Sequence, residues 1–281
     1  MKHVRRLEAE PTCLADYRAA NPDQDRADET NAGAVWAAFK SYRRVDTGAD
    51  APDTCYKWVL EELLKRQQGL CCYCEQRLVD GTGELVFNDY QIEHVLPKSV
   101  AKGRTLDWRN LAAACGGGTY RHHEDASRAS GQGESCGQTK GNKPLPAGCD
   151  PRDFPLSPSL VSVGIDGTLS PDVPACTEVN VSATALELAV TELLALNVER
   201  LRFARQEVGD NLRKWLIPLL EELVSASHLQ PAQVAQTMNL LIAGRLQPDQ
   251  HGYLRRFWTA ERCALGAPAE AWIQKNTGQF T

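Results

Sequence analysis

The first half of the chain carries one strong helical stripe of apolar residues. They recur three and four positions apart between Tyr56 and Leu64, which predicts a helix with one face on the core. This helix should end near Gly69, and Asp53 or Thr54, at the end of a polar loop over 45–54, is suited to cap its start. A shorter helical pattern covers 35–40.

The middle of the chain has a different pattern. Residues 84–95 are rich in β-forming side chains, which predicts one or two short strands with His94 near a strand end. Residues 116–135 are rich in Gly, Ser and Glu and should form a loop, and a short helix should follow over 137–143. Residues 161–169 alternate around Asp166-Gly167, which is typical of a β-hairpin.

The second half is mostly helical in pattern. One stripe runs through Leu186–Leu194, and a second helix should follow, capped by Asn197 and kinked or interrupted by Pro218. Pro231 and Gly244 frame another helix. A final helix is predicted to hold Tyr253, Leu254, Phe257 and Trp258.

These elements predict a mostly helical α+β protein in three regions. They are a polar and helical N-terminal region over 1–58, a compact central domain over 59–150, and a helical C-terminal domain over 151–281. The last of these carries no reactive group of residues.

Composition narrows the function. The formal net charge is −5, from 31 Lys and Arg against 36 Asp and Glu, which argues against nucleic-acid binding through a broad basic surface. Met1–Leu7 has no apolar run of the signal-peptide kind. No stretch approaches the ~18–20 apolar residues of a membrane span. We therefore expect a cytoplasmic protein with no membrane partner.

Nine of the ten cysteines divide into two groups, and the tenth, Cys72, lies between Cys71 and Cys74 and should point away from them. Cys71 and Cys74 form a Cys-x-x-Cys pair whose thiolates can reach one tetrahedral zinc, with Cys115 and Cys136 as the other ligands. A redox pair or inert buried thiols are the alternatives, and His122 or His123 could replace a late cysteine. In a reducing cytosol the scattered cysteines should be free thiols. These are Cys13, Cys55, Cys149, Cys176 and Cys263.

Glu93-His94 is the candidate reactive pair. A neutral imidazole can accept a proton from water at cellular pH, and a neighbouring carboxylate can bind Mg²⁺ or Mn²⁺. Adjacent strand residues point to opposite faces, so both side chains reach one site only at a strand end or bend. Alone, the pair would more simply be a surface or capping histidine beside an acid. Lys98, Lys140 and Lys143 could contact phosphates, or form a solvated surface.

The order of these motifs resembles the HNH endonuclease family with its ββα-metal core. It runs Cys-x-x-Cys, Glu-His-x-x-Pro-Lys, Asp-Trp-x-Asn-Leu, Cys and Cys-x-x-x-Lys-Gly-Asn, over about 60–145. The segments Leu70–Glu75 and Ile92–Ser99, followed by a helical C-terminal half, are most similar to the PtuB-type nucleases of Septu and retron anti-phage defence systems. The resemblance is looser over 1–59 and 150–281.

The resemblance implies a role for each matching residue. His94 would be the general base, Glu93 the acidic ligand of a catalytic Mg²⁺ or Mn²⁺, and Asn110 the residue that orients the loop bearing the histidine. Cys71, Cys74, Cys115 and Cys136 would hold a structural zinc. Gly137 departs from the pattern, since the family has His or Asn there. Gln138 is the favoured replacement ligand, with Asn142, His122 and His123 as alternatives, and a site that relies on Glu93, His94 and waters is a further alternative.

The resemblance also implies partners and an activity. Such nucleases work with a PtuA-like ATPase, in some systems beside a retron reverse transcriptase and its RNA and DNA. The expected function is metal-dependent hydrolysis of phosphodiester bonds in DNA or RNA during anti-phage defence. The alternative is a non-catalytic zinc module that binds nucleic acid or a partner in the same complex.

Overall fold

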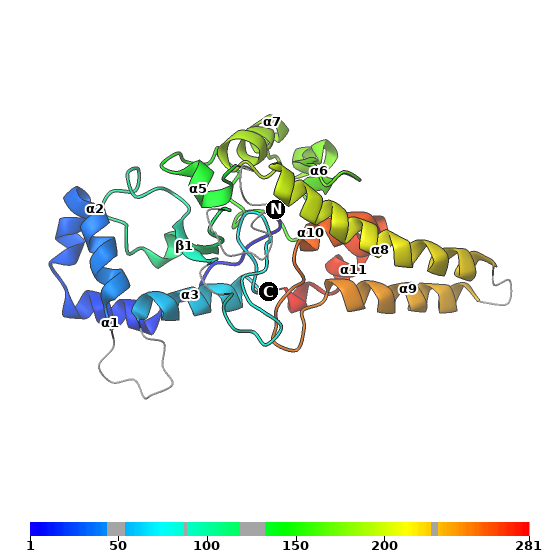
Figure 1. Cartoon of the computed structure of the whole chain (residues 1–281), viewed down its shortest axis with the longest axis horizontal. Helices are drawn as coiled ribbons and strands as arrows, with labels where there is room; N and C mark the ends of the chain where they lie inside the picture. Colours follow the sequence, from blue (N-terminus) through cyan, green and yellow to red (C-terminus); the bar gives the residue numbers. More distant parts are fainter. Residues whose placement is uncertain (44–53, 87–88, 119–132, 226–229, 281) are drawn as a thin grey trace.

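A computed structural model describes residues 1–43, 54–86, 89–118, 133–225 and 230–280 of the chain. Helices make up about half of an α+β fold that contains two small antiparallel sheets. Figure 1 shows an elongated molecule with helices α1 to α3 at one end, β1 and α5 near the middle, and the pair α8 and α9 projecting at the other end.

The N-terminal end is built from α1 (Thr12–Ala20), α2 (Gln24–Ser41) and α3 (Cys55–Arg66). The predicted cap of α3 is confirmed, because the Thr54 side chain accepts a hydrogen bond from the Lys57 backbone N–H. The predicted apolar stripe of this helix is buried, although the helix ends before Gly69. Met1, Val4 and Leu7 are also buried and join the same core as α3.

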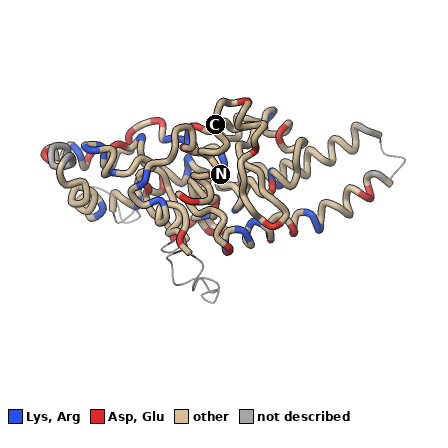
Figure 2. The backbone as a smooth tube through the Cα atoms, turned by 90° about the horizontal axis from the view of Figure 1, so that it is seen from above, with Lys and Arg blue, Asp and Glu red and all other residues tan. Residues whose placement is uncertain are grey.

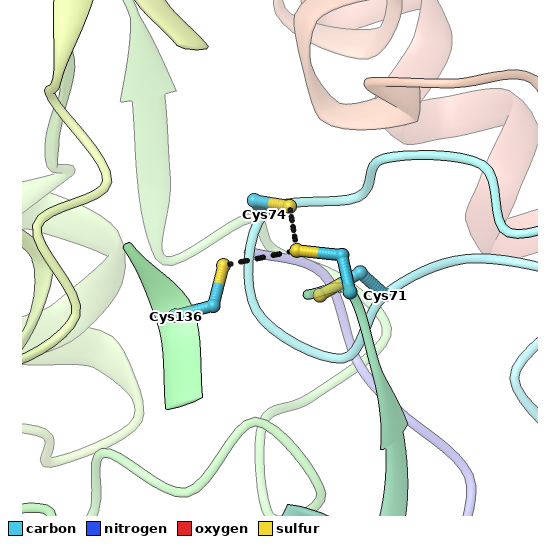
Figure 3. Close-up of side chains that lie close together, drawn as sticks. Cys71, Cys74 and Cys136 are labelled. Carbon is cyan, nitrogen blue, oxygen red and sulfur yellow. Dashed lines mark hydrogen bonds between the residues drawn. The ribbon is translucent and has the colours of Figure 1, made fainter. Parts of the chain in front are cut away.

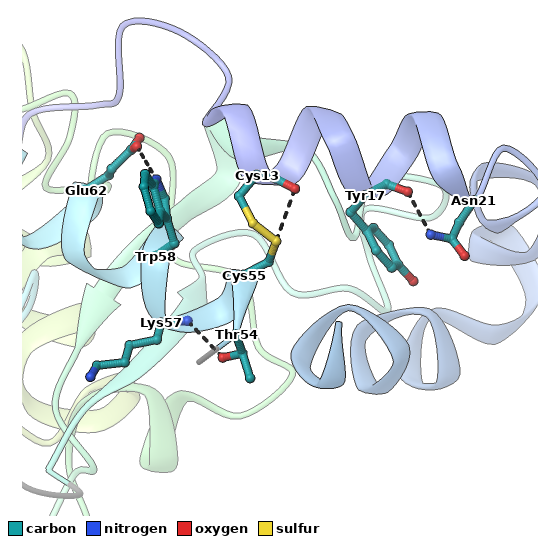
Figure 4. The surroundings of a disulfide bond; sticks show 8 residues. All are labelled: Cys13, Tyr17, Asn21, Thr54, Cys55, Lys57, Trp58 and Glu62. Atoms are coloured by element: carbon teal, nitrogen blue, oxygen red, sulfur yellow. Dashed lines mark hydrogen bonds between the residues drawn. A yellow bond between two sulfur atoms is a disulfide. The ribbon is translucent and has the colours of Figure 1, made fainter. Parts of the chain in front are cut away.

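Two cysteines expected to be free thiols are paired. Cys13 in α1 and Cys55 at the start of α3 form a disulfide, with Cα atoms 5.6 Å apart (Figure 4). The expectation of free thiols was therefore wrong for these two residues. It rested on an assumed reducing compartment and ignored the packing of α1 on α3, which places the two side chains face to face. Cys149, Cys176 and Cys263 are free, as expected.

The central sheet consists of β1 (Gln91–His94) and β2 (Leu111–Ala114), which pair antiparallel with Glu93 opposite Ala112 and His94 opposite Leu111. A single 3-10 turn, η1 (Trp108–Asn110), leads into β2, and α5 (Cys136–Lys140) follows later in the chain. The strand ending at His94 and the short helix after the loop were both predicted. The predicted loop over 45–54 lies almost wholly outside the described residues, as does most of the loop over 116–135.

The predicted hairpin is confirmed as β3 (Val161–Val163) and β4 (Leu169–Pro171). Its turn needs glycine, because Gly167 has a φ of 77° and a Cβ there would lie 1.9 Å from the Arg202 carbonyl oxygen. The chain continues through α6 (Val173–Glu178), α7 (Ala183–Leu188) and a π-helical turn, η2 (Ala189–Leu193).

The C-terminal helices differ from the prediction at Asn197 and narrow it at Pro218. Of the predicted kink or interruption, the interruption is absent, because helix α8 (Glu199–Ser225) continues through Pro218. Asn197 does not cap it, because the Asn197 amide instead donates to the Leu169 carbonyl and accepts from the Leu169 N–H, which fixes the hairpin.

Helix α9 (Pro231–Leu246) starts at the predicted proline, and α10 (Trp258–Leu265), α11 (Ala267–Lys275) and the 3-10 turn η3 (Thr277–Gln279) end the chain. Tyr253, Leu254 and Phe257 lie outside the last helices, contrary to expectation. The reason is the left-handed conformation of Phe257, with a φ of 53°, which makes Trp258 the first helical residue.

Buried apolar side chains form two clusters. The larger one gathers residues from Met1 to Val208, together with Phe257 and Ala260, around α3 and the central sheet. The second lies mainly between residues 212 and 280. Among the described residues, no helix has the length and apolarity to cross a membrane.

The projecting helices carry apolar side chains on their surface. Trp215 and Ile217 in α8 are each 50% exposed, and Leu240 in α9 is 68% exposed. Both views show α8 and α9 extending from the body in the same direction (Figures 1 and 2). Charges of both signs follow α8, whereas Arg245 is the one charged residue in α9.

Candidate metal centre and the adjoining Glu93–His94 site

Four cysteines from three separate segments converge beside the central sheet. Cys71 and Cys74 come from the turn after α3, Cys115 directly follows β2, and Cys136 is the first residue of α5. Figure 3 labels three of them and shows their sulfur atoms directed towards a common point. All four side chains are buried.

The spacing of the sulfur atoms fits a zinc ion. All four lie within 4.8 Å of one another, and the Cys115 sulfur is 3.6 Å from the sulfurs of both Cys74 and Cys136. A tetrahedral zinc with bonds of about 2.3 Å requires sulfur atoms about 3.8 Å apart. This cluster could therefore hold a metal such as zinc with little rearrangement.

The backbone around the cluster is arranged to support thiolates. The Gln76 N–H donates to the Cys74 sulfur and the Gly117 N–H donates to the Cys115 sulfur, each at 3.4 Å. Gly117 is required at its position, because its φ is 67° and a Cβ would lie 2.4 Å from the Ser135 carbonyl oxygen. The Gly-rich stretch that was predicted as a loop therefore begins with a close backbone contact between the segments that carry Cys115 and Cys136.

The ligand thiols differ in their ionisation: the pKa of Cys71 is lowered, whereas contacts among the same thiols raise the pKa of Cys115 and of Cys136 well above its usual value. Burial opposes ionisation of Cys71, but hydrogen bonds from Cys115, Cys136 and the adjacent thiols outweigh it and hold the Cys71 pKa well below its usual value. Burial raises the pKa of Cys72 well above its usual value, so this side chain stays a neutral thiol. Cys72 lies outside the cluster of four, as the motif spacing predicted.

A buried arginine lies close to the cysteine cluster. Arg205 of α8 is 3% exposed and donates to the carbonyl oxygens of Gly167 and Leu196. Burial lowers its pKa to about 10, and the charges of Cys74, Glu75 and Cys136 act in the opposite direction. Four thiolates and a zinc ion carry a net charge of −2, so a nearby guanidinium stabilises them.

Glu93 faces α5, and one of its carboxylate oxygens already has two partners. Its Oε1 atom lies 2.8 Å from the Lys140 ammonium and accepts a hydrogen bond from the Tyr73 hydroxyl at 3.2 Å. Lys140 is 1% exposed and also donates to the His94 carbonyl oxygen at 3.3 Å. Burial raises the pKa of Glu93, and the attraction of Lys140 offsets part of that rise.

Gly137 packs closely against two side chains of β1. A Cβ on residue 137 would lie 2.5 Å from the Glu93 Oε2 atom and 2.9 Å from the Gln91 amide nitrogen. A larger residue would require these two side chains to move, whereas glycine leaves them in place. Gln138, the favoured replacement ligand, instead donates to the Gln91 side-chain oxygen at 3.1 Å.

His94 lies on the other side of the strand and is held in one orientation. Its Nε2 atom is 2.8 Å from the Thr105 carbonyl oxygen, and its ring meets the Trp36 ring edge-to-face, with centroids 4.5 Å apart. Because a carbonyl oxygen only accepts, Nε2 carries the proton and Nδ1 keeps the lone pair. Burial lowers the His94 pKa to about 4, so the imidazole is neutral at pH 7.

Asn110 fixes the loop that follows His94. Its amide donates to the Leu96 carbonyl oxygen and accepts from the Leu96 N–H, both at 2.8 Å. Its own carbonyl accepts from the Val95 N–H at 3.1 Å. The resemblance implied a role in orienting this loop, and these contacts are suited to that role.

The other predicted residues are spread more widely. Lys98 lies in the loop held by Asn110, with its ammonium 5.6 Å from the centre of the Trp36 ring. Lys143 and Asn142 are exposed just after α5. The Lys140 ammonium is buried against Glu93, a position that does not suit the phosphate contact predicted for it. His122 and His123 lie outside the described residues.

A divalent cation does not fit the described surroundings of Glu93. Mg²⁺ and Mn²⁺ need several oxygen ligands, and a cation of the protein already neutralises this carboxylate. Within the described part of the chain, the four cysteines are the one group of three or more His, Cys, Asp or Glu side chains placed to hold a metal. The predicted Mg²⁺ or Mn²⁺ site is not supported here.

Sequence reasoning missed three residues that complete the site. Tyr73 lies inside the Cys-x-x-Cys segment and holds Glu93, Trp36 covers His94, and the Gln67 amide joins the end of α3 to β2 through both backbone groups of Ala113. Tyr73 could have been suspected from its place between two ligands. Gln67 and Trp36 carried no comparable signal.

Comparisons with known proteins place the chain in no family. No protein-family model matches it, and a search of curated proteins finds no match.

Proposed function

We propose that this chain is an HNH-type endonuclease that hydrolyses phosphodiester bonds in nucleic acid, with His94 as the general base. The observation that supports this most is the fixed, neutral imidazole of His94 at the end of β1, with Asn110 holding the following loop. The β1–β2–α5 arrangement around four buried cysteines is in keeping with a zinc-held ββα core.

The proposed chemistry begins at Nδ1 of His94. Thr105 fixes the tautomer in which Nδ1 can take a proton from water as that water attacks phosphorus. The bond from phosphorus to the 3′ oxygen breaks in the same displacement, which leaves a 5′-phosphate, and the departing 3′ oxygen takes a proton from solvent. A pKa near 4 keeps the base unprotonated but makes it weak in the free protein. A bound phosphate raises this pKa, because its negative charge stabilises the imidazolium. No step in this scheme uses a divalent ion.

Two lysines are proposed to hold the nucleic-acid backbone. Lys98 lies in the Asn110-held loop, and Lys143 is exposed at the end of α5. Each would add a point charge next to the scissile phosphate. Lys140 is assigned a different role, as the counter-ion of Glu93.

The resemblance to Septu and retron nucleases suggests the setting, in which a PtuA-like ATPase docks on this chain. The exposed side chains of Trp215, Ile217 and Leu240 on α8 and α9 are the proposed contact. Leu240→Glu should reduce co-purification with the ATPase, whereas the adjacent exposed change Asn239→Glu should not. Equal co-purification of both variants with the ATPase would refute this surface.

A second candidate is a zinc module that binds nucleic acid or a partner without cleaving. The pairing of Glu93 with Lys140 favours it, because this carboxylate is not available to a catalytic metal. A cleavage assay on plasmid DNA and tRNA, with and without the ATPase, separates the two candidates. Cleavage by the wild type that disappears in His94→Ala supports the endonuclease, and binding without cleavage under every condition supports the module.

A further inference from the structure

We propose that the Lys140 ammonium is the resident cation of Glu93 and keeps divalent metal ions from that carboxylate. The inference rests on the proposed function only in its choice of site, since it concerns the residue that the family resemblance makes a metal ligand.

The Lys140 ammonium occupies the space next to Oε1 of Glu93. Nζ lies 2.8 Å from Oε1, and Mg²⁺ would need to approach the same atom to about 2.1 Å. Two cations cannot share so small a volume without strong repulsion. The hydroxyl of the buried Tyr73 takes a further direction around the same oxygen.

The second carboxylate oxygen lies beside the start of α5. A Cβ on residue 137 would lie 2.5 Å from Oε2, which places the first turn of this helix next to that side of Glu93. Glycine also supplies no ligand atom of its own. The same short helix thus withholds a metal ligand at residue 137 and delivers an ammonium group from residue 140.

The burial of Lys140 indicates that its pairing with Glu93 is a fixed feature of the fold. A lysine side chain 1% exposed needs compensating groups, and it has the Glu93 carboxylate and the His94 carbonyl oxygen. Lys143, three residues later, is exposed, so the two lysines provide a matched pair for testing.

The test measures Mn²⁺ binding by the zinc-loaded full chain. Binding is detected as a loss of the electron paramagnetic resonance signal of free Mn²⁺. We expect wild type, Lys143→Met and Glu93→Gln to bind equally, which means no ion at Glu93. Lys140→Met, which removes the charge but keeps an apolar chain of similar length, should gain one Mn²⁺ per molecule. The double variant Lys140→Met/Glu93→Gln should lose that ion again.

Two results would overturn the proposal. One is a wild type that binds one Mn²⁺ more than Glu93→Gln does. The other is a folded Lys140→Met that gains no ion. If Lys140→Met does not fold, as judged by circular dichroism, the comparison of wild type with Glu93→Gln still decides. Cleavage is measured separately, so an inactive wild type would refute the endonuclease and leave the Mn²⁺ result readable.

Discussion

The cysteine cluster and the Glu93–His94 pair lie on the same small frame of β1, β2 and α5, but they are built differently. Four like side chains from separate segments turn towards one point, with sulfur atoms within 4.8 Å of one another. Glu93 and His94 are neighbours in sequence, yet one faces Lys140 and the other faces Thr105 and Trp36. Convergence builds a cluster that could hold a metal, whereas adjacency on a strand separates two side chains.

The largest effect should come from breaking the cysteine cluster. Cys136→Ser removes one thiolate and should abolish zinc binding and most of the folding of the central domain, because structural zinc contributes about 10 kcal/mol or more. Zinc content and thermal unfolding measure the two effects. Cys263→Ser, at a free thiol outside the cluster, is the control and should keep its zinc. A stably folded Cys136→Ser without metal would show that the cluster is not a structural centre.

The disulfide should have a smaller effect. Replacing Cys13 and Cys55 together with serine frees a cross-link that spans 42 residues, and stability should fall by roughly 2–4 kcal/mol. Urea unfolding of the oxidised wild type and the double variant measures this. The zinc content should not change, since both residues lie outside the cluster. Equal stability of the two proteins would mean that the disulfide is not formed in solution.

Loss of the Asn110 side-chain hydrogen bonds should affect the loop after His94 more than the overall fold. Asn110→Ala leaves the Leu96 N–H and carbonyl without their partner, which should cost about 2 kcal/mol of stability. Cleavage should fall about tenfold or more, since a displaced base loses its geometry. The exposed Asn142→Ala is the control. Cleavage at the wild-type rate would show that Asn110 does not position His94.

The pH dependence tests the burial of His94. Its pKa is about 4 in the folded protein and about 6.5 when unfolded, so the unfolded chain takes up the proton first as the pH falls. The His94 contribution to stability is complete above pH 6.5 and should fall by about 2 kcal/mol between pH 7 and pH 5. Urea unfolding of wild type and His94→Gln at both pH values isolates the contribution of His94 to the stability. Identical pH slopes would show that His94 is not buried as a neutral ring.

Much of the frame could be predicted from local patterns. The Cys-x-x-Cys spacing, the apolar stripe of α3 and the Asp166-Gly167 turn each depend on residues close in sequence, and each prediction matches the structure. The strand end near His94 was also predictable, because Pro97 follows three residues later.

The remainder depends on contacts between distant segments. Lys140 reaches Glu93 across 47 positions because of the way α5 packs on β1, which no spacing rule encodes. Cys13 meets Cys55 only because α1 packs on α3, and Asn197 fixes the hairpin in place of capping α8. In each case a contact with a distant segment determines the role of the residue, and the local sequence pattern does not predict that contact.

The most direct test of the proposed endonuclease is single-turnover cleavage of plasmid DNA and tRNA by wild type, His94→Ala and His94→Gln, with the ATPase present. Zinc content and circular dichroism are recorded on the same samples. We predict that both variants keep their zinc and fold but lose at least about 100-fold in rate, since a general base contributes 10²–10⁴-fold. Cleavage by folded His94→Gln at the wild-type rate would contradict the assignment.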